Sequence, residues 1–223
     1  MPESSAGPSH TLSEYESKQR LASLGVPVAV EKLAATADDA ARAAEEIGGP
    51  VAVKLCGDKI AHKTERNLVR LGVAPGEATR AAAAELLAAA RPEDGDVGVL
   101  VAQMVSGRRE LIAGCVQDPT FGNCVMLGIG GIFAEALADV VFRLVPLSPA
   151  DAASMIDDLH NQKMLDDFRG EPAVDREALT QVLLGLSRLV ESDPQIVSVD
   201  LNPLIVSEGR PVAVDALIEV RGE

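Results

Sequence analysis

The segment VDLNPLIVSEGRPVAVDA, residues 199–216, most constrains the fold because it is typical of two strands joined by a tight turn. Gly209 adopts positive φ without steric cost, as a two-residue hairpin loop requires. A loop centred on Glu208 and Gly209 places Asn202 directly opposite Asp215. Cross-strand neighbours have Cβ atoms about 4.5–5.5 Å apart. We therefore expect both side chains on one face, with Asp200 two residues along it.

Two interpretations of this polar face remain open at this point. Carboxylate and amide oxygens suit Mg²⁺, which in phosphate chemistry takes one or two protein carboxylates and completes its shell with phosphate and water. Alternatively, the polar residues only protect the edge of a sheet from aggregation.

Charge and composition limit the partners of the chain. The net charge of −14 over 223 residues argues against nucleic acid or an anionic membrane. No run reaches the roughly 18 apolar residues of a membrane helix, and residues 1–10 lack the features of a signal peptide. We expect a cytoplasmic protein with a disordered tail over residues 1–10. Cys56, Cys115 and Cys124 lie in apolar runs without CxxC spacing, which indicates small buried hydrophobes.

The order of the expected elements differs between the two halves. Strands and helices alternate in the first half, which favours an α/β or split βαβ layout. In the second half strands precede two amphipathic helices and the hairpin, which favours α+β. The segment MVSGRR interrupts an apolar strand, so we expect one lobe over residues 11–105 and another over residues 106–223 that contains the hairpin 199–216.

Two cationic positions are candidates for phosphate chemistry. Lys54 lies among valines in PVAVKLC, where a charge needs a partner; it either reaches a phosphate or protects a strand edge. His62 lies in DKIAHKTER beside Lys59, Lys63 and Arg66, a dense basic cluster in an acidic chain. A neutral imidazole can accept a phosphoryl group, although a solvent-exposed loop histidine is the simpler interpretation.

Taken together, several motifs resemble one known family, the ATP-grasp module of NDP-forming acyl-CoA synthetases. The similarity is greatest to the separate β subunit of ADP-forming acetate–CoA ligase and more distant to the β subunit of succinate–CoA ligase. It covers nearly all of residues 11–220. The segments that carry it are LSEYESKQRLASLGVPV, PVAVKLCGDKIAHKTERNLVRLGV, VAQMVSGRRELIAGCVQDPTFGNCVMLGIGGIFAEALADVVFRLVPLS, DFRG and VDLNPLIV followed by AVDA.

The resemblance implies an ATP-grasp fold, with ATP or ADP bound between two lobes, and a role for each matching residue. Lys54 would bind nucleotide phosphates, and Asn202 and Asp215 would hold Mg²⁺. His62 would carry phosphate, and Asp200 would lie where a phosphohistidine docks. The strand that ends in Gln103, Met104 and Val105 would contact the adenine through its backbone, and Glu110 would contact ribose or metal.

The implied reaction is acyl-CoA + ADP + phosphate ⇌ carboxylate + CoA + ATP, through an acyl phosphate and a phosphohistidine. No glycine loop of a CoA-binding domain occurs in this sequence. The resemblance therefore implies a partner α subunit that carries the CoA-binding and phosphohistidine domains, in an α2β2 assembly. Two alternatives are a non-catalytic or regulatory ATP-grasp-like subunit and an ATP-grasp carboxylate ligase that acts alone.

One departure from the family concerns the loop after His62. Many relatives have an acidic residue and a glycine pair there, whereas this chain has Asn67 and Leu68. Asparagine tolerates the left-handed conformation best among residues with a side chain. Leucine does not, so the phosphate contacts of this loop are in question.

Overall fold

The computed structural model describes residues 9–60, 63, 66–131, 134 and 138–222. The chain divides into two compact units. The N-terminal unit comprises Thr11–Glu16 and Ala29–Met104. The C-terminal unit comprises Val105–Glu223 with Ser17–Val28 and the described residues that precede Thr11. The boundary after Met104 lies at the expected segment, but Ser17–Val28 groups with the C-terminal unit rather than with the rest of residues 11–105.

The N-terminal unit is a four-stranded sheet with two helices. Its strands follow the order β2-β5-β3-β4, and every recorded pair is antiparallel. Because β5 lies between β2 and β3 and is antiparallel to both, β2-α2-β3 is a split βαβ unit, as one of the expected layouts required. The elements are β2 (Glu31–Ala34), α2 (Ala37–Ile47), β3 (Val51–Cys56), β4 (Val69–Val73), α3 (Glu77–Ala88), a 3₁₀ turn (Pro92–Asp94) and β5 (Gly98–Gln103).

Local sequence accounts for the positions of these elements. Thr36 caps α2 by accepting a hydrogen bond from the backbone N–H of Asp39, and Gly48 ends the helix with positive φ. Strand β3 is buried along its whole length. Small alanines of α2 and α3 pack against valines and leucines of β3 and β5, so the core of this unit contains no aromatic side chain among the described residues.

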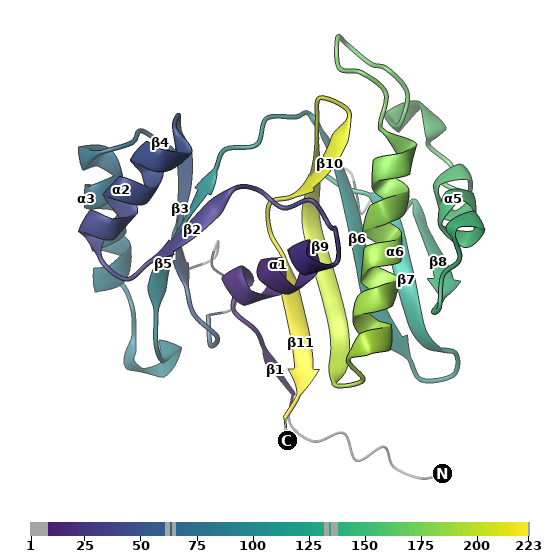
Figure 1. Ribbon diagram of the computed structural model, residues 1–223, viewed down its shortest axis with the longest axis horizontal. Helices are drawn as coiled ribbons and strands as arrows, with labels where there is room; N and C mark the ends of the chain where they lie inside the picture. Colours follow the sequence, from purple (N-terminus) through teal and green to yellow (C-terminus); the bar gives the residue numbers. More distant parts are fainter. Residues whose placement is uncertain (1–8, 61–62, 64–65, 132–133, 135–137, 223) are drawn as a thin grey trace. The chain divides into compact units, whose positions relative to one another are not determined.

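The C-terminal unit is a seven-stranded sheet in the order β1-β11-β9-β6-β7-β8, with β10 paired to β9 (Figure 1). Its helices are α1 (Glu14–Ser23), whose first turn belongs to the N-terminal unit, α5 (Pro149–Asp157) and α6 (Arg176–Ser192), with a 3₁₀ turn at Gln162–Met164. The strands are β1 (Ser9–Thr11), β6 (Arg109–Asp118), β7 (Gly122–Ile129), β8 (Val140–Leu144), β9 (Ile196–Ser207), β10 (Arg210–Ala213) and β11 (Leu217–Arg221). Ser9 and His10 thus belong to a strand, although they were expected in a disordered tail.

The helices of this unit cover one face of its sheet. The hydroxyl of Ser17 in α1 accepts a hydrogen bond from the backbone N–H of Ile218 in β11. The thiol of Cys115 in β6 donates to the carbonyl of Leu186 in α6. Arg143 in β8 pairs with Asp158 at the end of α5. All three cysteines are buried and free, as expected from their apolar surroundings.

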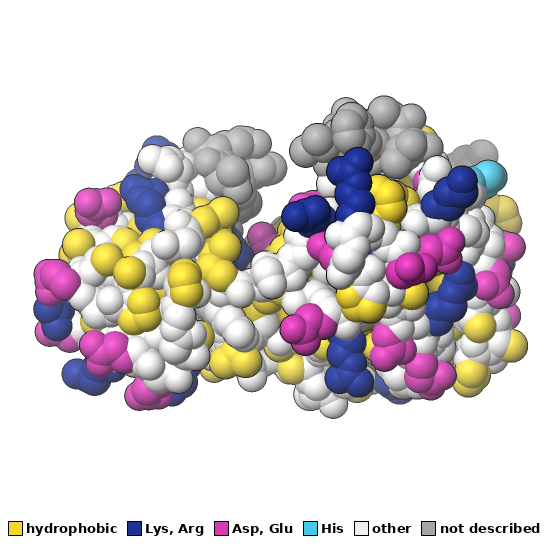
Figure 2. Space-filling model, turned by 90° about the horizontal axis from the view of Figure 1, so that it is seen from above, with side chains coloured by type: hydrophobic (Ala, Val, Ile, Leu, Met, Phe, Trp, Pro, Cys, Tyr) yellow, Lys and Arg dark blue, Asp and Glu magenta, His cyan; other side chains and the backbone are white. Residues whose placement is uncertain are grey.

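Charged side chains of both signs are interspersed over the molecular surface seen in Figure 2. This view shows no extended basic area on the side facing the viewer. Within the described part of the chain, no helix is long and apolar enough to cross a membrane.

Candidate functional site

The hairpin at residues 199–216 has the expected register. Ser207 pairs with Arg210 and Leu204 with Ala213, and Glu208 and Gly209 form the loop between them, both with positive φ. Pairing resumes in the same register where Asp200 lies opposite Leu217 of β11. Residues 214–216 separate β10 from β11, and the N–H of Val214 donates to the carbonyl of Pro203. Asp215 therefore lies in the interval that continues the register opposite Asn202.

A β-bulge re-aims the side chains at this point. Along β6, Leu111 pairs with Leu204 but Ala113 pairs with Leu201, so Asn202 and Pro203 together oppose Ile112. Bulges bend a strand locally and are frequent next to functional sites. The burial pattern agrees, because Val199 and Leu201 are buried before the bulge, and Leu204 and Val206 after it. Alternation along β9 leaves Asp200 and Asn202 on the exposed face, and the register shift brings Leu204 and Val206 back to the core side.

The two carboxylates of the hairpin influence each other. The pKa of Asp200 is raised above its ordinary value, first because its carboxylate is partly removed from water and second because of the negative charge of Asp215. A cation placed between them would offset the repulsion between the two carboxylates. In the described part of the chain no three His, Cys, Asp or Glu side chains cluster as metal ligands. A cation here would therefore use the Asp215 carboxylate, the Asn202 amide and ligands from outside the chain, with Asp200 close by, which fits Mg²⁺.

Lys54 has a carboxylate partner inside the N-terminal unit. Its ammonium lies 2.6 Å from an oxygen of Glu14, and both side chains are buried. The second oxygen of Glu14 accepts a hydrogen bond from Lys63, which follows His62 in the sequence. One buried carboxylate thus joins strand β3 to the loop after it. Sequence reasoning missed Glu14 because it looks like an ordinary acidic residue in the first turn of a helix.

A second ion pair holds the same loop near its end. Arg66 donates to both oxygens of the buried Asp94, at 2.7 and 2.9 Å. The Arg66 hydrogen bond lowers the pKa of Asp94 from its ordinary value of 3.8 to about 2. Lys63 and Arg66, two members of the expected basic cluster, therefore have partners within the unit. His62 itself lies outside the described residues.

The departure from the family glycines has a structural explanation. Asn67 has φ of 56°, the left-handed conformation in which a glycine is usual. Leu68 is buried in the core cluster of the N-terminal unit. The loop therefore returns to the sheet through a hydrophobic anchor.

The remaining predicted residues lie at the ends of strands. The backbone N–H of Gln103 donates to Val30 and that of Met104 to Pro50, so neither N–H is available to an adenine. Val105 begins the C-terminal unit. Glu110 is paired with Ile205 in the β6–β9 ladder. The structure thus brings Glu110 to the sheet that carries Asp200 and Asn202.

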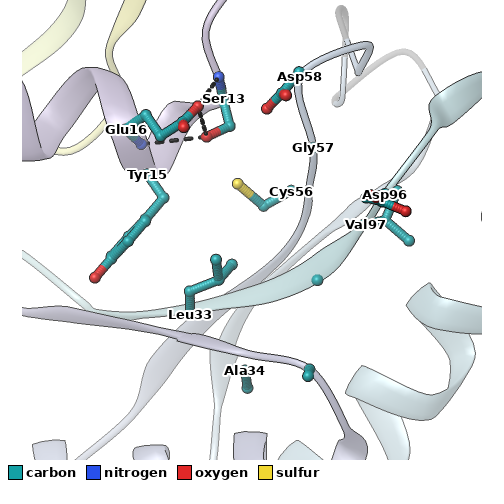
Figure 3. A pocket seen from close by; sticks show the side chains of 12 residues that line it. Ser13, Tyr15, Glu16, Leu33, Ala34, Cys56, Gly57, Asp58, Asp96 and Val97 are labelled. Carbon is teal, nitrogen blue, oxygen red and sulfur yellow. Dashed lines mark hydrogen bonds between the residues drawn. The ribbon is translucent and has the colours of Figure 1, made fainter.

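A pocket of about 490 Å³ lies in the N-terminal unit, near the end of β3 (Figure 3). Leu33 and Val97 give it apolar walls, and Tyr15 lines it from α1. Its acidic lining residues are Glu16, Asp58 and Asp96. Because these carboxylates would repel phosphate, this pocket is a poor site for the phosphates of a nucleotide.

Comparison with known proteins identifies the family. The model of the ATP-grasp domain matches residues 4–220. The chain belongs to the ATP-grasp family. The β subunit of ADP-forming acetate–CoA ligase II from Pyrococcus furiosus is 43% identical over 216 residues, 94% of this chain and 91% of that protein. ADP-forming acetate–CoA ligase I of Archaeoglobus fulgidus is 35% identical over 198 residues, 87% of this chain but only 29% of that protein.

A solved ATP-grasp structure is also similar. It is acetyl-coenzyme A synthetase 1 of Ca. Korarchaeum cryptofilum in complex with coenzyme A and Mg-AMPPCP, with its phosphohistidine segment pointing towards the nucleotide binding site. The identity is 36%, the TM-score is 0.80, and the match covers 93% of this chain and 92% of that one. The expected ATP-grasp fold, of mixed α/β class, is thereby confirmed.

Glu14→Gln should destabilise the N-terminal unit by about 3–5 kcal/mol, because it leaves buried ammonium groups beside a neutral amide. The free energy of unfolding in urea measures this. The control is Lys32→Gln, which removes the exposed pair of Lys32 with Glu46 and should cost under about 1 kcal/mol. Equal effects of the two variants would contradict the importance of the buried pair.

The ion pair of Asp94 should make stability depend on acid pH. Because its pKa is lowered to about 2, its contribution is complete above the ordinary pKa near 4 and disappears as the pH falls through about 2. Asp94→Asn should therefore be less stable than the wild type at pH 7, with a difference that shrinks between pH 4 and pH 2. Urea unfolding at several pH values tests this. A difference that stays constant down to pH 2 would contradict it. Glu93→Gln, at an exposed neighbour, is the control.

Proposed function

We propose that this chain is the nucleotide-binding β subunit of an ADP-forming acyl-CoA synthetase. The reaction is acyl-CoA + ADP + phosphate ⇌ carboxylate + CoA + ATP. The observation that carries the proposal is the hairpin, whose register exposes Asn202 and Asp200 and places Asp215 in the interval opposite Asn202. The similarity of this chain to the β subunit from Pyrococcus furiosus over 91% of that protein supports it.

Each residue has a stated part in this proposal. Asn202 and Asp215 hold Mg²⁺, which supplies neutralisation of phosphate charge when bound. Asp200 faces the arriving phosphohistidine, beside the Asp215 carboxylate whose negative charge contributes to the raised pKa of Asp200. Glu110 contacts ribose or metal. Around the adenine, carbonyl groups rather than the N–H groups of Gln103 and Met104 make the contacts, together with the backbone of Val105.

Lys54 keeps its proposed role as a point charge for the nucleotide phosphates. Its strand is buried, so its ammonium is held in one place rather than sampling solvent. Glu14 provides the counter-charge that stabilises the ammonium before phosphate arrives. Phosphate oxygens then compete with Glu14 for the same donor.

The partner is an α subunit that carries the CoA-binding and phosphohistidine domains, and we propose an α2β2 assembly in the cytoplasm. The Archaeoglobus fulgidus relative is much longer, since this chain matches only 29% of that protein. Its length supports a partner that carries the remaining domains of such an enzyme. A non-catalytic ATP-grasp-like subunit remains the second candidate. The observation in its favour is the buried Leu68, which replaces a family glycine next to the phosphate loop.

Asn202→Ala and Asp215→Ala should each weaken binding of Mg-ADP by roughly tenfold or more, because one protein ligand is lost. Isothermal titration with ADP, with and without Mg²⁺, measures the effect. Glu219→Gln is the control, since this carboxylate on the same sheet contacts Ser198. Wild-type affinity for Mg-ADP in both alanine variants would show that these polar residues only protect the edge of the sheet. The wild type alone should bind Mg-ADP without making acyl-CoA.

His62→Ala, in the complex with the α subunit, should lower ATP formation by roughly 100-fold or more and leave Mg-ADP binding nearly unchanged. Because the acceptor is the neutral imidazole, transfer should decline as the pH falls below about 6.5. Radiolabelled phosphate on the protein, labile in acid and stable in alkali, is the direct readout. The control is His160→Ala, which changes an exposed histidine. Full turnover by His62→Ala would show that His62 is not in the relay.

A further inference from the structure

The sheet face that carries Asp200 also carries an unbroken apolar area on its outer strands. Directly opposed residues of an antiparallel sheet share a face. Across β6, β7 and β8 the pairings give three adjacent rows on this face, which we call the apolar grid. The rows are Val116–Cys124–Leu144, Gly114–Met126–Phe142 and Ile112–Gly128–Val140.

The apolar grid is unusual for an outer sheet face. An antiparallel sheet with one face on the core normally carries polar residues on the other. Here every grid position is apolar, and Val116 is 40%, Phe142 50% and Leu144 53% exposed. Contiguous exposed apolar patches mark interaction sites.

The apolar grid is not the core side of its sheet. Cys115 and Arg143, which contact α6 and α5, alternate with the grid residues along β6 and β8. Figure 1 shows α6 lying along β6 and β7. The described helices of the C-terminal unit thus pack against the other face, because Ile218, which is bonded to α1, is also on that side.

The apolar grid is continuous with the candidate cation site. Gly114 in its middle row pairs with Asp200 of β9, and Asp200 pairs with Leu217 of β11. Leu217 is itself 39% exposed. A Cβ on Gly114 would lie 2.2 Å from the carbonyl oxygen of Val199, so glycine permits the close approach of β6 and β9 there. A molecule that covers the grid would therefore reach Asp200 directly.

The lengths of the relatives indicate what covers this face. The same sequence region is a separate β subunit in Pyrococcus furiosus and less than a third of one longer ligase chain in Archaeoglobus fulgidus. In the Pyrococcus furiosus arrangement the remainder of the enzyme is a separate chain. Under the proposed function, such a partner must reach the nucleotide site by docking on the β subunit. The apolar grid contains no charged side chain, so the surface that fits it is apolar as well.

We propose that the apolar grid is the docking surface for the partner α subunit, which seats an apolar segment there and so delivers its phosphohistidine beside Asp200. This inference rests on the proposed function. It assigns the site of assembly to β6–β8 and separates assembly from nucleotide binding, which uses other residues.

The test combines Phe142→Ser and Leu144→Ser in one variant, with Leu71→Ser as the control. Leu71 is 67% exposed on β4 of the N-terminal unit. The probe is the cognate CoA-binding α subunit, purified separately. Sedimentation velocity measures its dissociation constant for each β variant, and calorimetry measures Mg-ADP binding by β alone. Circular dichroism and urea unfolding establish that the variants are folded.

The expected result is a dissociation constant raised at least tenfold for the double variant, with Mg-ADP affinity and the Leu71→Ser complex unchanged. Assembly of the folded double variant with wild-type affinity would overturn the proposal. A second result would also overturn it: the wild type self-associates, and the double variant loses self-association but still binds the α subunit. The occupant of the grid would then be a second copy of this chain. A wild-type chain that does not bind Mg-ADP would contradict the proposed function. The sedimentation result would still decide whether the grid is the docking site.

Discussion

The long strand β9 is paired along both edges, and the C-terminal unit depends on this double pairing. It bonds to β6 on one side and to β10 and then β11 on the other. Any slip of one residue would move Val199, Leu201, Leu204 and Val206 from the core to the surface. The register that fixes the core therefore also fixes where Asp200 and Asn202 point. The bulge at Asn202 and Pro203 lets one strand serve both purposes, because Asp200 and Asn202 point outward before it and the bulge returns Leu204 and Val206 to the core.

Much of this hairpin could be predicted from sequence because its determinants are local. Gly209 and the apolar alternation set the turn and the register, and the structure confirms both. Helix α2 was also predictable from its cap at Thr36. The bulge was not, since it arises from the pairing of β9 with β6, far away in sequence. The same holds for the membership of Ser17–Val28 in the C-terminal unit, which depends on long-range packing.

The electrostatics of the candidate phosphate region depend on partners that sequence does not reveal. Lys63 and Arg66 looked like a free basic cluster, but Glu14 and Asp94 come from distant segments and bind them. A strongly acidic chain can place a carboxylate beside each cation, so the count of nearby lysines and arginines overestimates the local positive potential. The position of Lys54 in a strand could be predicted from the sequence. Its counter-charge, Glu14, could not.

The pocket beside β3 gives the protein a built-in optical reporter. Tyr15, which lines that pocket, is the single tyrosine of a chain without tryptophan. Tyrosine fluorescence therefore originates from one side chain, next in sequence to Glu14. Any event that changes the environment of the first turn of α1 alters the whole emission signal, and stopped-flow experiments can follow it without an attached label.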